Sequence, residues 1–171
     1  MARRHLAVLS AGPAVEQLAA WRREWDPVMA AVAPPHVTLV YPEETADEDL
    51  LLVRAQAACA RTAPFRLGLR GVVAEEAGRG GVFVAVDDVD GAWQALRLDL
   101  LRPPMTRYPG VGPHATIVHP RTSDRGPECF RSLGSRRLDV EVDVTEVVFT
   151  ETTAESFTVL RRFPLRRNAA N

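Results

Sequence analysis

"PPHVTLVYPEE", residues 34–44, and "GPHATIVHPRT", residues 112–122, are two copies of one phrase. Each copy reads Pro-His-x-Thr, then an aliphatic residue, a valine, an aromatic ring and a proline. Together they contain three of the four histidines of a 171-residue chain. Agreement over so many positions favours an internal duplication over coincidence.

Both copies predict a β-strand, because each is rich in β-branched residues and ends at a proline. Side chains along a strand alternate between its two faces. His36 and Thr38 therefore share one face of the first strand, and His114 and Thr116 share one face of the second. If the two copies are related by symmetry, two imidazoles and two hydroxyls converge on one site.

The segments around each phrase predict a similar order of elements on both sides of the chain. The predicted strands cover residues 5–10, 36–41, 65–74, 82–86, 114–119, 138–150 and 157–163. The predicted helices cover residues 13–32, 47–61 and 91–101 and a short stretch within 122–133. Pro27 lies inside the first of them and is expected to kink or split it. Both halves read as a phrase strand, a helix and a hairpin, and the second half has no evident opening strand.

This order predicts an α+β fold of a single domain, residues 1–171, with two pseudo-symmetric lobes facing each other across a central cleft. Each lobe is expected to hold an antiparallel sheet and helices. The expected lobes are roughly residues 1–90 and 91–171, and the polar tail 166–171 is expected to be frayed.

Composition places the chain among ordinary globular proteins, with 46% hydrophobic residues, 25% charged residues and a net charge of −1. A protein that coats nucleic acid nonspecifically is usually clearly basic, so an RNA end or a small fragment is the better expectation. The apolar run near the N-terminus is short and is interrupted by Gly12 and Pro13, so it predicts a strand and a helix rather than a signal peptide. No stretch has the length of a membrane span.

The two cysteines, Cys59 and Cys129, do not form a disulfide framework or a metal-binding pattern. A reducing compartment therefore fits, and we expect the protein in the cytoplasm. Nothing in the sequence calls for an obligate protein partner.

Two histidines with two threonines suit the chemistry of a phosphodiester. A neutral imidazole can accept a proton from the attacking oxygen, and an imidazolium can donate one to the leaving oxygen. Threonine hydroxyls can donate hydrogen bonds to the phosphate oxygens, where negative charge accumulates. The scheme needs no metal or cofactor, and the zinc patterns HxH and HExxH are absent from the sequence.

The motifs "HVTL" and "HATI", in a small chain with duplicated elements, resemble those of the two-histidine (2H) phosphoesterase superfamily. That superfamily includes 2′-5′ RNA ligase-like proteins and cyclic phosphodiesterases. The resemblance implies catalysis by His36 and His114, with Thr38 and Thr116 as phosphate ligands. It also implies a metal-independent phosphodiesterase acting on 2′,3′-cyclic phosphates or 2′-5′ linkages of nucleotides or RNA ends.

One departure leaves the subfamily open. Many 2′-5′ RNA ligase-like proteins carry a basic residue soon after the second motif, whereas here Arg appears only at position 121. Three alternatives stay open: ligation through a 2′-5′ bond, hydrolysis of a small metabolite, and non-catalytic binding of RNA ends.

Four further residues are candidates for substrate contact: Tyr41, Arg107, Tyr108 and His119. Tyr41 and His119 occupy equivalent places in the two phrases, on the strand face opposite the histidines, where packing is the competing interpretation. Arg107 and Tyr108 lie in a Pro/Gly-rich loop just before the second phrase, where loops often carry function. The remaining histidine, His5, is interpreted as a strand-edge residue without a role.

Overall fold

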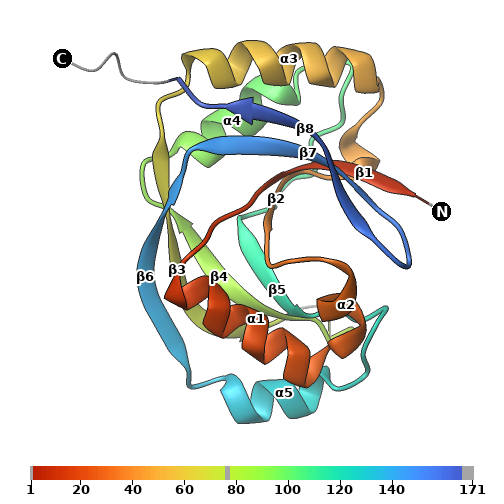
Figure 1. The fold of residues 1–171 in the computed structure, drawn as a ribbon, viewed down its shortest axis with the longest axis vertical. Coiled ribbons are helices and arrows are strands. Elements are labelled where there is room, and N and C mark those ends of the chain that lie inside the picture. The colour runs from red at the N-terminus through yellow and green to blue at the C-terminus, as the bar shows by residue number, and fades with distance from the viewer. Residues whose placement is uncertain (1, 76–77, 167–171) are drawn as a thin grey trace.

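The computed structural model describes residues 2–75 and 78–166, which form eight strands, five α-helices and one 3₁₀ turn (Figure 1). The strands are β1 Arg3–Val8, β2 Val37–Val40, β3 Phe65–Ala74, β4 Val82–Asp88, β5 His114–Val118, β6 Arg137–Val144, β7 Glu146–Thr152 and β8 Phe157–Pro164. The helices are α1 Pro13–Trp25, α2 Pro27–Val32, α3 Glu48–Arg61, α4 Ala92–Leu100 and α5 Gly126–Leu133, and the 3₁₀ turn is Pro42–Glu44.

The strands form one sheet in the order β6-β3-β4-β5-β2-β1-β7-β8, and every pair is antiparallel. The predicted α+β antiparallel class is thus confirmed. A separate sheet in each lobe was expected, but the two phrase strands β2 and β5 pair through Val37 and Ala115 and join all the strands into one sheet. We call this junction the β2–β5 seam.

The seam divides the sheet into two groups of four strands, one from the middle of the chain, residues 65–144, and one from its two ends. β3 and β4 lie with β5 and β6, whereas β1 and β2 lie with β7 and β8. A division near residue 90 therefore does not match the arrangement of the strands. The opening strand that the second half seemed to lack is β4, because β4 flanks β5 as β1 flanks β2.

The expected single strand 138–150 is wrong, because the chain changes partners at Thr145. β6 pairs with β3 at one edge of the sheet, and β7 pairs with β1 and β8 in the other group. The backbone carbonyl of Thr145 accepts a hydrogen bond from the Leu165 N–H at 2.9 Å. The alternation of apolar and polar residues in β6 breaks at Thr145 and Glu146, and β7 continues with three consecutive buried apolar residues, 147–149. This break marks the crossing, but it does not tell which strands β7 pairs with.

The expected helix 13–32 is interrupted at Pro27, which begins α2. The side chain of Asp26 accepts a hydrogen bond from the Met29 N–H at 3.0 Å and so caps this second helix. Pro27 stands where its missing N–H costs nothing. The predicted frayed tail 166–171 falls outside the described residues except for Arg166, whose N–H donates to the Thr62 carbonyl at 2.8 Å.

One face of the seam is packed against helix α1, which contacts β5. Val37 and Ala115 point to that face and are buried, and with Leu18 of α1 they line a residual void of only about 20 Å³. Since neighbours along a strand alternate, the opposite face of the seam carries the histidines and threonines of the phrases.

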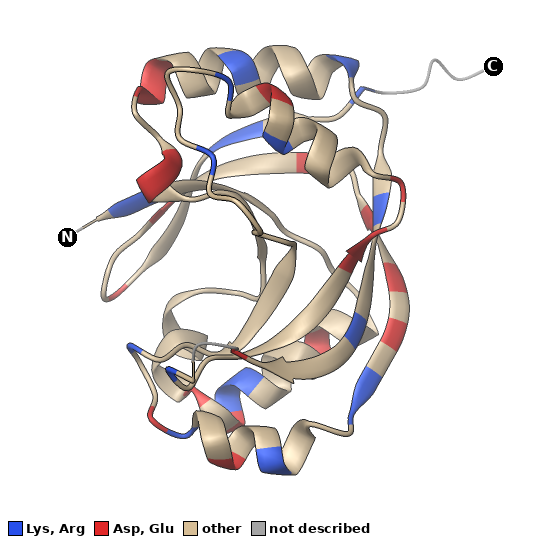
Figure 2. Cartoon of the chain, turned by 180° about the vertical axis from the view of Figure 1, so that it is seen from behind, with Lys and Arg blue, Asp and Glu red and all other residues tan. Residues whose placement is uncertain are grey.

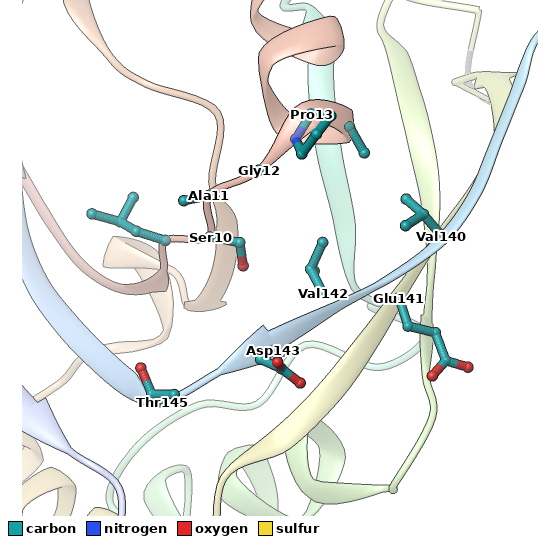
Figure 3. A pocket seen from close by; sticks show the side chains of 11 residues that line it. Ser10, Ala11, Gly12, Pro13, Val140, Glu141, Val142, Asp143 and Thr145 are labelled. Carbon is teal, nitrogen blue, oxygen red and sulfur yellow. The ribbon is translucent and has the colours of Figure 1, made fainter.

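A larger cavity of about 510 Å³ lies between the start of α1 and strand β6 (Figure 3). Ser10, Asp143 and Thr145 are among the side chains around it, and none of the phrase histidines or threonines lines it. Figure 2 shows acidic and basic residues interspersed over the helices and strand β6, in keeping with the small net charge.

Candidate active site

The register of the seam brings the two phrases together around a local two-fold axis. Val37 lies opposite Ala115 in an antiparallel pair, so Thr38 lies opposite His114, and His36 lies opposite Thr116 by the same register. Directly opposed residues of antiparallel strands have Cβ atoms about 4.5–5.5 Å apart. All four side chains predicted as site residues thus share one small region of the sheet.

The two histidines are oriented by equivalent hydrogen bonds to their own backbone. Nδ1 of His36 lies 2.9 Å from the carbonyl oxygen of Pro34, and Nδ1 of His114 lies 3.1 Å from that of Gly112. A carbonyl oxygen can only accept, so Nδ1 carries the hydrogen in both rings. In a neutral ring the lone pair is then on Nε2, which is the nitrogen available for proton transfer.

The two rings differ in what surrounds them. His36 packs against His5 and Phe157, with ring centroids 5.5 Å apart in both pairs. His114 packs against Phe83, with centroids 4.8 Å apart. The site is therefore symmetric in its backbone and asymmetric in its packing.

Burial above all, with the positive charges of Arg22 and His114, lowers the pKa of His36 to about 4. The hydrogen bond to the Pro34 carbonyl acts in the opposite direction but is outweighed. His36 is consequently neutral at neutral pH, with a lone pair on Nε2 ready to accept a proton.

A buried carboxylate follows the first phrase and holds the end of its strand. Glu44 is fully buried and accepts hydrogen bonds from the backbone N–H groups of Tyr41 and Tyr108, both at 3.0 Å. It also forms a buried ion pair with Arg97 of α4, whose guanidinium donates to the Leu39 carbonyl in β2 at 2.6 Å. Glu44 thereby connects β2, α4 and the loop before β5.

A second buried carboxylate, that of Asp26, holds the end of the second phrase. Asp26 accepts from the His119 N–H at 2.9 Å and from the Thr122 hydroxyl at 2.7 Å, besides capping α2. Tyr41 and His119 are thus equivalent in structure as well as in sequence, since each backbone N–H donates to a buried carboxylate.

The four further candidates are placed as follows. Tyr41 is half-buried beside the Arg97 guanidinium, and burial raises the pKa of its hydroxyl to about 12. Tyr108 is 42% exposed and Arg107 is exposed in the same loop. His119 is half-buried, its ring Nδ1 accepts from the Arg121 N–H at 3.1 Å, and burial lowers its pKa. Their place in substrate contact therefore stays a prediction.

Sequence reasoning missed His5, Phe157 and Phe83, which contact the motif histidines. His5 is buried and not at a solvent-facing strand edge, contrary to the expectation. These contacts depend on which strands pair, and no local pattern around any of the three residues reports that pairing.

Among residues 2–75 and 78–166, no group of three or more His, Cys, Asp or Glu side chains is arranged to hold a metal ion. In the same residues, no helix combines the length and the apolar composition of a membrane span.

Comparison with solved structures places the fold beside that of E. coli LigT. LigT with bound NADP⁺ superposes with a TM-score of 0.66 at 20% identity, over 96% of this chain and 98% of that chain. LigT with bound 3′-AMP gives 0.66 at 21% identity over the same shares. A protein of Thermus thermophilus gives 0.59 at 20% identity, over 98% of this chain and 100% of that chain.

Among curated proteins, none matches the sequence. The family model described as the 2′-5′ RNA ligase superfamily matches residues 11–155, which include both phrases. With the fold of LigT and two His-x-Thr strands paired at the centre of the sheet, the chain belongs to the 2′-5′ RNA ligase superfamily, the two-histidine phosphoesterases.

Proposed function

We propose that the protein is a metal-independent phosphodiesterase that hydrolyses 2′,3′-cyclic phosphates or 2′-5′ phosphodiester bonds of nucleotides or RNA ends. The observation that carries the proposal is the pair of imidazoles on one face of the seam, each with its Nδ1–H directed to a backbone carbonyl. Membership of a phosphoesterase and ligase family supports it.

The proposed reaction is an acid–base displacement at phosphorus. Nε2 of His36 accepts a proton from the attacking water while the water oxygen forms a bond to phosphorus. The bond between phosphorus and the leaving oxygen breaks, and Nε2–H of His114 donates its proton to that oxygen. After this step His36 is an imidazolium and His114 is a neutral ring. Proton exchange with solvent restores the starting state of both rings.

The assignment of His36 as the initial proton acceptor follows from its ionisation. A group whose pKa lies at about 4 is neutral at physiological pH and cannot serve as the initial donor. The proton donor is then His114, whose Nδ1–H bond to Gly112 is retained in the imidazolium. The hydroxyls of Thr38 and Thr116 are proposed to donate to the non-bridging phosphate oxygens.

The substrate class draws support from the ligands of the structural neighbours. E. coli LigT has been crystallised with 3′-AMP, with ATP and with phosphate. We extend this to a nucleotide or RNA-end substrate here, bound without an obligate protein partner. Both cysteines are free and buried, which agrees with action in a reducing cytoplasm.

The test is a hydrolysis assay with EDTA present on a 2′,3′-cyclic nucleotide, an oligonucleotide with a cyclic phosphate end, and a 2′-5′ dinucleotide. We expect turnover that survives EDTA and falls by about 10²–10⁴-fold in His36→Ala and in His114→Ala. Thermal melts of both variants establish that they remain folded.

Other outcomes point to the alternatives. Binding of the nucleotide without turnover on any substrate supports a non-catalytic protein that holds RNA ends, and inactivity together with absent binding points to a small metabolite. Loss of activity to EDTA alone contradicts the metal-free mechanism.

The family description also favours a second activity, the joining of RNA ends through a 2′-5′ bond. In this reaction the 5′-hydroxyl of an acceptor RNA attacks the phosphorus of a 2′,3′-cyclic phosphate, and the bond from phosphorus to the 3′-oxygen breaks, which leaves a 2′-5′ bond. One histidine accepts the proton of the attacking hydroxyl and the other donates a proton to the 3′-oxygen. Incubation of an RNA carrying a 2′,3′-cyclic phosphate end with an acceptor RNA tests it, and a joined product resistant to a 3′-5′-specific nuclease is the expected result.

A further inference from the structure

The third histidine near the seam, His5, has no part in the mechanism above although it touches His36. It lies in β1 with only 8% of its surface exposed. Its ring centroid is 5.5 Å from that of His36, and the two ring planes are inclined by 39°. Phe157, at the start of β8, lies 5.5 Å from His36 and 6.3 Å from His5, so the three rings close a triangle.

The other motif histidine has simpler surroundings. Within residues 2–75 and 78–166, the ring contact of His114 is to Phe83 alone, at 4.8 Å. Phe83 lies on β4, directly across from Thr116. Two rings thus enclose His36 where one contacts His114, although both histidines have the same backbone hydrogen bond.

Strand pairing and one hydroxyl hold His5 in place. His5 faces Thr150 across the β1–β7 pair. The Thr150 hydroxyl donates to the His5 carbonyl oxygen at 3.2 Å and lies within 3.3 Å of both ring nitrogens, so it can accept from whichever nitrogen carries the hydrogen. Because the His5 ring is buried and has this hydrogen-bond partner, its position beside the His36 ring is fixed.

The charged and titratable groups that shift the two rings are all basic. His36 and Arg3 act on His5, and Arg22 of α1 and His114 of β5 act on His36. Burial lowers the pKa of His5 itself to about 3, so it is neutral at physiological pH. No carboxylate is among the groups that shift either ring within the described residues, and the only group that favours an imidazolium at His36 is the Pro34 carbonyl, whose effect on the pKa is outweighed.

We propose that His5, together with Phe157, is a positioning residue that keeps water from one side of the half-buried His36 ring and fixes its orientation, and thereby makes His36 the proton acceptor and His114 the proton donor. This inference rests on the proposed function and deepens it. Its substance is that the unequal packing of two equivalent histidines assigns their roles.

The experiment compares wild type with His5→Ala, which opens the space beside His36, and His5→Phe, which keeps a ring there without nitrogens. The ionisation of His36 is followed by NMR through the Cε1–H signal, and kcat and KM are measured on the substrate identified above. In wild type and His5→Phe we expect His36 to titrate far below 6.5.

In His5→Ala we expect its pKa to rise by about one unit or more, because the ring gains solvent. We also expect kcat to fall by about 10-fold with KM changed by less than about 3-fold, since the lost positioning acts on proton transfer rather than on binding. If His5→Ala does not fold, His5→Asn is used in its place. Asparagine also opens the space beside His36, and its amide retains a hydrogen-bond partner for Thr150. Phe83→Leu is the matched control, since it alters the ring beside His114 and leaves the titration of His36 unchanged.

A purely structural role predicts a different pattern. If His5→Ala or His5→Asn lowers the melting temperature while His36 titrates as in wild type, the inference is overturned. Since NMR reads the ionisation without turnover, this result is independent of whether His36→Ala abolishes activity, and failure of the inference is separable from failure of the proposed function.

Discussion

Thr38 and Thr116 each stand two residues after a motif histidine and directly across the seam from the other histidine. Valine has the same shape and the same preference for strands but no hydroxyl. We expect Thr38→Val and Thr116→Val each to lower kcat by about 10²-fold, because each removes one hydrogen-bond donor to the phosphate.

The matched control for these two variants is Thr158→Val, at an exposed position on β8. Steady-state kinetics with thermal melts provide the measurement. Unchanged kcat in both motif variants means that the hydroxyls do not serve the phosphate.

The ionisation of His36 sets the acid limb of the rate profile. As the proton acceptor it must be neutral, and its pKa is lowered to about 4 by burial. We expect kcat/KM, which reports the free enzyme, to fall as the pH drops through about 4, rather than through the ordinary value of 6.5. A limb near the ordinary value, on protein that circular dichroism shows to be folded, contradicts the assignment of His36 as the base.

His5 makes stability depend on pH in a defined direction. Above pH 6.5 it is neutral in the folded and the unfolded chain and contributes no pH dependence. Between 6.5 and about 3 the unfolded chain binds a proton that the folded chain excludes, so the free energy of unfolding falls as the pH is lowered. At about pH 4.5 this loss amounts to about 3 kcal/mol, since each unit is worth about 1.4 kcal/mol.

His5→Phe removes this proton and is expected to lose about 3 kcal/mol less than wild type between about pH 7 and about pH 4.5. Urea titrations at the two pH values measure the difference. An equal decrease in the free energy of unfolding of the two proteins would show that His5 binds a proton in the folded state.

At the scale of elements, a buried carboxylate anchors the end of each motif strand. Glu44→Gln leaves the Arg97 guanidinium buried without a counter-charge. Breaking a buried ion pair in this way costs about 3–5 kcal/mol. We expect the free energy of unfolding to fall by that amount, as measured by urea denaturation.

Asp99→Asn is the control for Glu44→Gln, because Asp99 pairs with Arg61 and Arg102 at the surface. An exposed pair contributes about 0–1 kcal/mol. Equal losses in the two variants contradict the anchoring role of Glu44.

Most elements could be predicted from the sequence because their signals are local. The phrase strands end at prolines, and α3 begins where Asp47 accepts the Leu50 N–H. The crossing at Thr145 was not predicted: the alternation of β6 breaks there, but a break in period does not show that β6 and β7 pair with different strands. The role of β4 as the partner of β5 is equally a matter of long-range pairing.

The same distinction applies to the site. His36, Thr38, His114 and Thr116 were found from the repeat, since alternation puts each pair on one face. His5 and Phe157 come from strands far away along the chain, and only the order β2-β1-β7-β8 brings them beside His36.

At the scale of the whole molecule, the two groups of strands cannot be separated by cutting the chain once. A fragment of residues 1–90 contains β1 and β2 without β7 and β8, and β3 and β4 without β5 and β6. We expect fragments 1–90 and 91–171, produced separately, to lack cooperative unfolding by circular dichroism. Mixed together, they are expected to recover it, because each supplies the strands that the other needs. Cooperative unfolding of either fragment alone contradicts this expectation.

The interleaving of helices has a consequence for ancestry. α1 contacts β5 and α4 contacts β2, so each motif strand is covered by a helix from the other repeat. A shorter ancestor with a single repeat would have completed its fold only as a homodimer, in which symmetry forces both histidines to be the same. Joining two copies in one gene removes that constraint, and each copy can then accumulate its own substitutions. Two different surroundings, with two rings beside His36 and one beside His114, require both repeats to lie in one chain, since a symmetric homodimer gives both histidines the same neighbours.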